Sequence, residues 1–166
     1  MEKEIILNQN EDVFEELNRK YLLFNIEDTL YGLSLLNVKE IINVTEITSV
    51  PGSFDYIKGI INLRGGIIPI IDARLKFGML EREYDNQTCI IILETDDSNV
   101  GLIVDSVSEV VEIEQDQLMP PPDVGDSEKN FLDDVFQFNN KLVLNIDCAK
   151  FLRNDIEFIK GINDTM

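Results

Sequence analysis

The segment YGLSLLNVKEII, residues 31–42, returns in altered form as VGLIVDSVSEVV at residues 100–111. A shift of 69 residues aligns the glycine, acidic and branched apolar positions of the two segments: Gly32 with Gly101, Val38 with Val107, Glu40 with Glu109 and Ile41 with Val110. The stretches before them, 21–28 and 89–97, are both apolar runs that lead into polar turns, as strands of hairpins do. The chain therefore contains an internal repeat of a β-rich unit.

A second and weaker repeat lies further along each unit. GGIIPIIDARLKF (65–77) resembles NNKLVLNIDCAKFL (139–152), with a shift of 75 residues. Each begins with a pair of residues that suit a primed hairpin turn, namely Gly65-Gly66 and Asn139-Asn140. Each then continues through a β-rich strand to an aspartate, and we expect Asp72 and Asp147 to be helix N-caps. The Pro/Asp-rich stretch 120–130 accounts for the added residues.

These repeats predict an all-β fold with short helices. The two units, about 21–82 and 88–152, each have four or five short strands rich in Ile and Val, which favours a small barrel in each unit. Short helices are predicted for NVKEII (37–42) and near 154–162. Pro69 lacks a donor for a strand ladder, so its strand is predicted to lie at a sheet edge or to carry a bulge.

The ends of the chain differ from the repeat units. Residues 1–18 form an acidic extension that is predicted to be a loose helix, with Phe14 and Leu17 as its apolar contacts. Residues 154–166 form a C-terminal tail or short helix.

The composition excludes several classes of function. The chain has 32 acidic and 14 basic residues, a net charge of −18, and such a surface repels nucleic-acid phosphates and anionic membranes. It has no histidine, which excludes Ser-His-Asp and Cys-His catalysis and most zinc sites. The first 20 residues lack the apolar core of a signal peptide, so we expect a cytoplasmic protein whose partners are proteins. A small enzyme that works through carboxylates remains an alternative at this point.

Two residue types need a separate interpretation. Cys89 and Cys148 are far apart in apolar stretches and form no CxxC motif, so they are predicted to be reduced, buried side chains.

Arg64 stands between two isoleucine-rich runs, in GIINLRGGIIPIID (59–72), which indicates partial burial. A partly buried guanidinium needs a carboxylate, and Glu40 is the candidate partner. From the residues alone, a binding role for Arg64 and a solvated hairpin tip weigh about equally.

The chain also resembles a known family. The residues Gly59, Asn62, Leu63, Arg64, Gly65, Ile67, Pro69, Ile70, Ile71 and Asp72 match the signature of the chemotaxis coupling proteins of the CheW family. The resemblance extends over about 19–153. It implies two five-stranded barrels of the Src-homology type around a shared core. It also implies a non-enzymatic adaptor, without cofactor or metal, that links the cytoplasmic tips of chemoreceptors to the histidine kinase CheA.

The resemblance further implies which residues meet these partners. The receptor surface lies in a groove between the barrels, with Arg64, Glu40, Gly59, Gly101 and Val110 as its residues. The kinase surfaces are apolar spots at the barrel ends, with Leu22, Val38 and Val124 as their residues. Further copies of the same protein are possible partners. A coupler of a non-flagellar motility or developmental pathway is the alternative within the same family.

Overall fold

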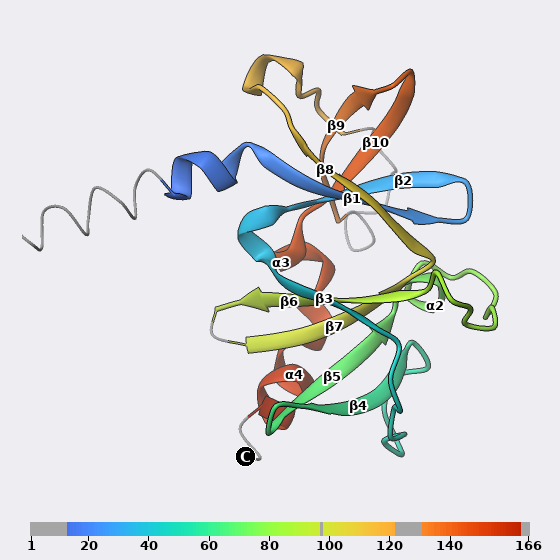
Figure 1. Cartoon of the computed structure of the whole chain (residues 1–166). Coiled ribbons are helices and arrows are strands. Elements are labelled where there is room, and N and C mark those ends of the chain that lie inside the picture. The colour runs from blue at the N-terminus through green and yellow to red at the C-terminus, as the bar shows by residue number, and fades with distance from the viewer. Residues whose placement is uncertain (1–12, 97, 122–130, 164–166) are drawn as a thin grey trace, which may run out of the picture.

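The computed structural model describes residues 13–96, 98–121 and 131–163, and strands dominate these residues (Figure 1). The strands form two five-stranded sheets. Barrel A contains, in spatial order, β8 (Ser106–Glu112), β1 (Lys20–Ile26), β2 (Thr29–Ser34), β10 (Lys141–Ile146) and β9 (Leu132–Phe138). Barrel B contains, in spatial order, β3 (Val38–Asn43), β6 (Cys89–Thr95), β7 (Ser98–Val104), β5 (Gly66–Asp72) and β4 (Ile57–Leu63). The predicted mainly-β class is confirmed.

Each sheet is closed by the segment that follows one of its edge strands. In barrel B the edges are β3 and β4, and the chain after β3 makes a β-bridge between Thr48 and Ile60 of β4. In barrel A the chain after β8 makes the corresponding bridge between Met119 and Val135 of β9. These bridges connect the two edges of each sheet, so both sheets roll into small barrels and cover their open edges.

The two barrels exchange strands between the repeat halves. Barrel A takes β1 and β2 from the first half and β8, β9 and β10 from the second. Barrel B takes β6 and β7 from the second half and β3, β4 and β5 from the first. The chain changes barrels after β2, through the 3₁₀ turn η1 (Leu35–Asn37), and after β7, through Asp105. The repeat is therefore real, but the prediction of one barrel for each contiguous half is wrong.

The apolar core of the described residues divides into three clusters. One fills barrel A and includes Leu23 and Phe136, and one fills barrel B and includes Ile70 and Ile92. The largest lies between the barrels and includes Leu22, which belongs to the same strand as Leu23. Because successive side chains of a strand point to opposite faces, β1 and β6 are buried on both faces and read as continuous apolar runs.

Two local predictions are corrected by the structure. The segment predicted as a helix at 37–42 is mostly β3, in which half-buried residues alternate with exposed ones, a period of two rather than 3.6. The β4–β5 turn is Arg64-Gly65, both with positive φ (51° and 86°), and not Gly65-Gly66. The equivalent turn Asn139-Asn140 is confirmed, with φ of 50° and 63°.

The prediction that Pro69 marks an edge strand is also wrong. β5 lies between β7 and β4, and the bulge of this hairpin is on β4, where the register shifts between Ile57 and Gly59. Pro69 is tolerated because the parallel ladder to β7 begins one residue later, at Ile70.

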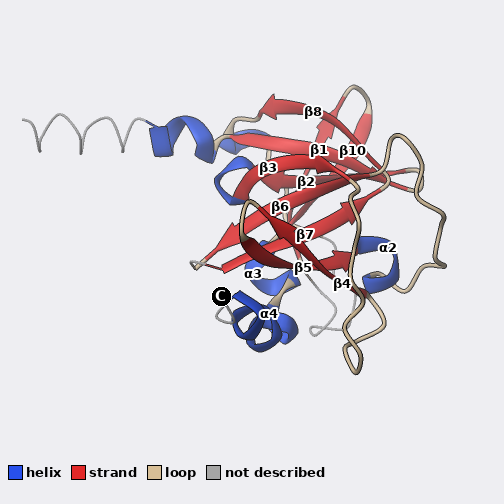
Figure 2. Ribbon diagram, turned by 60° about the horizontal axis from the view of Figure 1, so that its bottom comes forward, coloured by secondary structure: helices blue, strands red, loops and turns tan. Residues whose placement is uncertain are grey.

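The short helices lie where the aspartate caps predict them. Asp72 accepts from the backbone N–H of Leu75 at the start of α2 (Ala73–Lys76), and Asp147 accepts from that of Lys150 at the start of α3 (Cys148–Phe151). The turns η2 (Gln115–Gln117) and η3 (Arg153–Asp155) and the C-terminal helix α4 (Ile156–Asn163) complete the elements. Residues 13–18 are helical, with Phe14 exposed. Figure 2 shows α4 at the periphery of the strand-rich body.

A buried polar cluster fastens the start of the C-terminal segment to barrel B. Lys76 of α2 donates to the carboxylate of Asp155 and to the carbonyl of Phe151, while the hydroxyl of Tyr56 donates to the other oxygen of Asp155. Burial raises the pKa of Tyr56, and its bond to Asp155 adds to the shift. The segment that follows, α4, packs on β5 and β7.

Candidate protein-docking site

The Arg64–Glu40 ion pair crosses one end of barrel B. Arg64 occupies the first position of the β4–β5 turn, and its Nη2 donates to Oε1 of Glu40 on β3. The predicted pairing is confirmed, but the predicted partial burial is wrong, since 67% of the Arg64 side chain is exposed against 27% for Glu40. An ion pair this exposed contributes about 0–1 kcal/mol to stability. The guanidinium can therefore change partner at little cost to the fold.

The ion pair borders a hollow at the mouth of barrel B. The hollow has a volume of about 530 Å³, and all five strands contribute to it. Its lining includes Lys39 of β3, Leu63 of β4, Ile68 of β5, Ile92 of β6 and Asn99 of β7, together with Arg64 and Asn163. Two cations on the rim of a hollow lined by both polar and apolar side chains suit a partner that carries an acidic side chain next to apolar ones.

The two glycines predicted for the receptor surface have packing roles. Gly59 has φ +145°, and a Cβ at that position would lie 1.9 Å from the carbonyl oxygen of Thr48, so the closing bridge of barrel B requires glycine there. A Cβ on Gly101 would lie 2.5 Å from Cδ1 of Ile70. Both glycines are buried, so they shape the barrel that carries Arg64 and offer no side chain to a partner.

Val110 is exposed, and it has an exposed counterpart that the sequence analysis missed. Val110 lies on β8 at the edge of barrel A with 49% exposure. Ile41, its equivalent under the 69-residue shift, lies on β3 at the edge of barrel B with 42% exposure. The repeat already aligned these two residues, and this alignment was the signal that could have identified Ile41.

The residues predicted for the kinase surface separate in the structure. Leu22 is 2% exposed and faces the core between the barrels, so the prediction that it forms a surface spot is wrong. Val38 is half-buried at the start of β3, where it packs against the same core and pairs with Leu93. Val124 lies outside the described residues.

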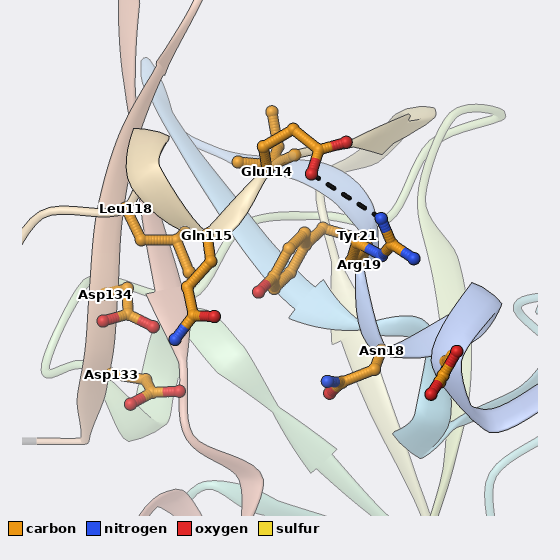
Figure 3. Close-up of a pocket in the computed structure, with 10 residues that line it drawn as sticks. Asn18, Arg19, Tyr21, Glu114, Gln115, Leu118, Asp133 and Asp134 are labelled. Carbon is orange, nitrogen blue, oxygen red and sulfur yellow. Dashed lines mark ion pairs between the residues drawn. The ribbon is translucent and has the colours of Figure 1, made fainter. Parts of the chain in front are cut away.

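A second hollow lies at one end of barrel A (Figure 3). It has a volume of about 450 Å³, and its lining includes Arg19, Tyr21, Glu114, Asp133 and Asp134. Arg19 forms an ion pair with Glu114 over 3.6 Å. Burial raises the pKa of Asp133, as do the neighbouring carboxylates Asp134 and Asp147. The hollow is therefore mainly acidic.

The described residues contain no group of three His, Cys, Asp or Glu side chains that could hold a metal ion. None of their helices is both long and apolar enough to cross a membrane.

Cys148 is buried, as predicted, and burial raises the pKa of its thiol to about 12. Cys89 is only partly buried.

The double barrel, with exposed apolar residues on its edge strands and an arginine at one mouth, has the architecture of a protein-docking scaffold. Comparison with known proteins identifies the family. A model of the CheW-like domain matches residues 20–155. The chain is 32% identical over 142 residues to the chemotaxis protein CheW of Klebsiella aerogenes, a match that covers 85% of this chain and 86% of the relative.

Two further matches agree. The chain is 32% identical over 134 residues to the chemotaxis protein CheW of Bacillus subtilis, which covers 80% of this chain and 86% of the relative. The crystal structure of the scaffolding protein TtCheW from Thermoanaerobacter tengcongensis matches with a TM-score of 0.72 and 37% identity, over 78% of this chain and 88% of that one. The chain belongs to the CheW family of chemotaxis coupling proteins, which are scaffolds and not enzymes.

Proposed function

We propose that this chain connects the cytoplasmic tips of chemoreceptors to the regulatory domain of the kinase CheA, in the cytoplasm beside the membrane-bound receptors. Arg64 is the leading receptor contact, and Glu40 holds it in place until a receptor binds. The observation that carries the proposal is the exposure of Arg64 on a two-residue turn. Its ion pair with Glu40 is also exposed and therefore adds little to the stability of the fold. Arginine is enriched among the residues that dominate binding energy in protein interfaces.

The edge strands supply the apolar part of the docking surface. Ile41 and Val110 are exposed at equivalent places on the two barrels, and apolar side chains in such positions are typical of the core of an interface. Val38, which is half-buried at the start of β3, is our candidate for the contact with the kinase regulatory domain.

The test is a reconstitution of CheA, a receptor cytoplasmic fragment and this chain, with kinase autophosphorylation as the readout. We expect Arg64→Ala to leave the protein folded but unable to support receptor control of the kinase. The matched control is Arg82→Ala, which removes another half-exposed, ion-paired arginine from a loop outside the barrel mouth. Receptor control by Arg64→Ala equal to that by the unsubstituted chain would exclude the proposal.

A further inference from the structure

The two barrels differ at one place that the internal repeat makes visible. In barrel A the parallel ladder between β10 and β2 begins with the pair Val143–Leu30. In barrel B the ladder between β5 and β7 begins with Ile70–Gly101, which is two residues later in the repeat. The missing pairs are those of Ile68 with Asn99 and Pro69 with Val100. In barrel B, β5 and β7 are therefore unpaired at the end that carries the Arg64 turn.

Pro69 accounts for the shorter ladder. It stands where barrel A has Leu144, and it has no N–H to donate across to β7. In a regular ladder the missing bond would leave backbone groups at the start of β7 without a strand partner. A buried backbone group without a partner costs free energy, so another part of the molecule must satisfy it.

The side chain of Asn163 takes this role. Its Oδ1 accepts from the backbone N–H of Asn99 at 3.0 Å, and its Nδ2 donates to the carbonyl of Asn99 at 3.1 Å. Nδ2 also donates to the carbonyl of Ile159, one turn earlier in α4, which fixes the orientation of the amide. A carboxamide has the same donor and acceptor as a peptide group, so Asn163 replaces a strand residue at this position.

The helix that carries Asn163 lies at the barrel mouth. α4 packs on β5 and β7, with Ile159 almost fully buried, and Figure 1 shows it beside β5. Asn163 and Arg64 both line the hollow at the mouth of barrel B. All of α4, including Asn163, lies beyond the 20–155 match to the family model. The C-terminal helix therefore pairs with the part of β7 that the ladder to β5 leaves unpaired.

We propose that Asn163 is a positioning residue for receptor docking. Its side chain makes the hydrogen bonds to the β7 backbone that the shortened ladder lacks, and so holds the Arg64 turn at a fixed place relative to β7. The inference rests on the proposed receptor-binding role of Arg64. Asn163 acts through Asn99 of β7 on the geometry of the barrel mouth.

The experiment uses four variants of the full chain: Asn163→Ala, Pro69→Leu, their combination, and Asn154→Ala as an exposed asparagine control just before α4. Amide hydrogen exchange at Asn99 is the first readout, and affinities for a receptor fragment and for the kinase regulatory domain are the second. We expect Asn163→Ala to speed exchange at Asn99 and to weaken receptor binding by about tenfold, the effect of losing a hydrogen bond or two. Kinase binding should stay within about twofold of the unsubstituted chain.

The double variant makes the test specific. Leucine at position 69, as at the equivalent Leu144, restores an N–H that can donate to a carbonyl of β7, so Pro69→Leu should recover receptor affinity in the Asn163→Ala background. Failure of this rescue, or equal losses of receptor and kinase affinity, would overturn the inference and leave Asn163 with a general structural role. If Arg64→Ala weakens receptor binding and Asn163→Ala does not, the inference fails while the proposed function stands. If Arg64→Ala has no effect, the proposed function itself fails.

Discussion

Arg74 donates through Nη1 to the carboxylate of Asp105 over 3.2 Å, and Asp105 is the one residue between β7 of barrel B and β8 of barrel A. Nη2 of Arg74 donates to Glu27, in the β1–β2 turn of barrel A. Asp105 also accepts from the backbone N–H of Glu27 at 2.8 Å. The Arg74 and Asp105 side chains are only 9% and 12% exposed. This pair therefore joins the two barrels where the chain passes between them.

We expect Asp105→Ala to destabilise the fold by about 2–4 kcal/mol, because it leaves the buried Arg74 guanidinium with the half-exposed Glu27 as its one carboxylate partner among the described residues. Urea unfolding measures the change. Arg82→Ala is the control, because Arg82 meets the same carboxylate from the surface at 3.4 Å, and its loss should cost less than about 1 kcal/mol. Equal costs for the two variants would contradict the account.

Gly59 and Gly52 provide a test of barrel closure. Both have positive φ, but a Cβ on Gly59 would meet the backbone of Thr48, whereas a Cβ on Gly52 would meet nothing within 4 Å. We expect Gly52→Ala to cost about 1 kcal/mol of strain and Gly59→Ala more than about 3 kcal/mol. Thermal unfolding of the two variants compares them, and a Gly59→Ala variant as stable as Gly52→Ala would show that the closing bridge is dispensable.

Asn145 is expected to weaken barrel A. It is 2% exposed on the same face of β10 as the interior residue Val143, and neither polar atom of its amide has a hydrogen-bond partner among the described residues. The equivalent position in barrel B is Ile70, which packs beside Gly101 as Asn145 packs beside Gly32. We expect Asn145→Ile to stabilise the protein by about 1–2 kcal/mol in urea unfolding, since it removes a buried polar group without a partner. A loss of stability would indicate that the amide is needed inside the barrel.

Stability should fall above about pH 10, where tyrosine ionises in an unfolded chain. Tyr84 donates to Asp72 at 2.7 Å, and burial, together with that bond, raises its pKa in the folded state. A raised pKa stabilises the fold below the unfolded value, and this contribution disappears as the pH rises above it. Urea unfolding between pH 9 and about 11 should give a shallower decline for Tyr84→Phe than for the unsubstituted chain. Parallel declines would refute the role of this hydroxyl.

Val38→Asp tests the kinase contact. The substitution puts a charge at a half-buried apolar position, and we expect it to weaken binding to the kinase regulatory domain by about tenfold or more. Val107→Asp is the matched control, because Val107 is the repeat equivalent of Val38 and packs against the same core. Similar dissociation constants for the two variants would count against Val38 as a specific contact.

Some local features of this fold could be predicted from the sequence. The Asp72 and Asp147 caps and the Asn139-Asn140 turn depend on neighbouring residues only, and the structure confirms them. The sequence also predicts the Arg64–Glu40 pair, although the partial burial on which that prediction rests is wrong.

The long-range pairing of the strands could not be predicted from the sequence. Leu22 belongs to a continuous apolar run, which shows that it is apolar but not that both faces of β1 are covered. Strand membership of the barrels depends on the crossings after β2 and β7, which no local pattern marks. Asn163 has no motif, and its role appears only when the two barrels are compared pair by pair.

The exchange of strands gives the chain an interlocked topology. Cleavage of the backbone in the exposed stretch 80–83 would separate the first repeat half from the second. Neither fragment would contain all the strands of a barrel, because each barrel is built from strands of both halves. By the same geometry, a single half present alone would have to recruit a second copy to complete either barrel, as domain-swapped dimers do. The chain thus resembles a two-subunit assembly in which the two subunits, here the repeat halves, are joined by a peptide bond into one chain.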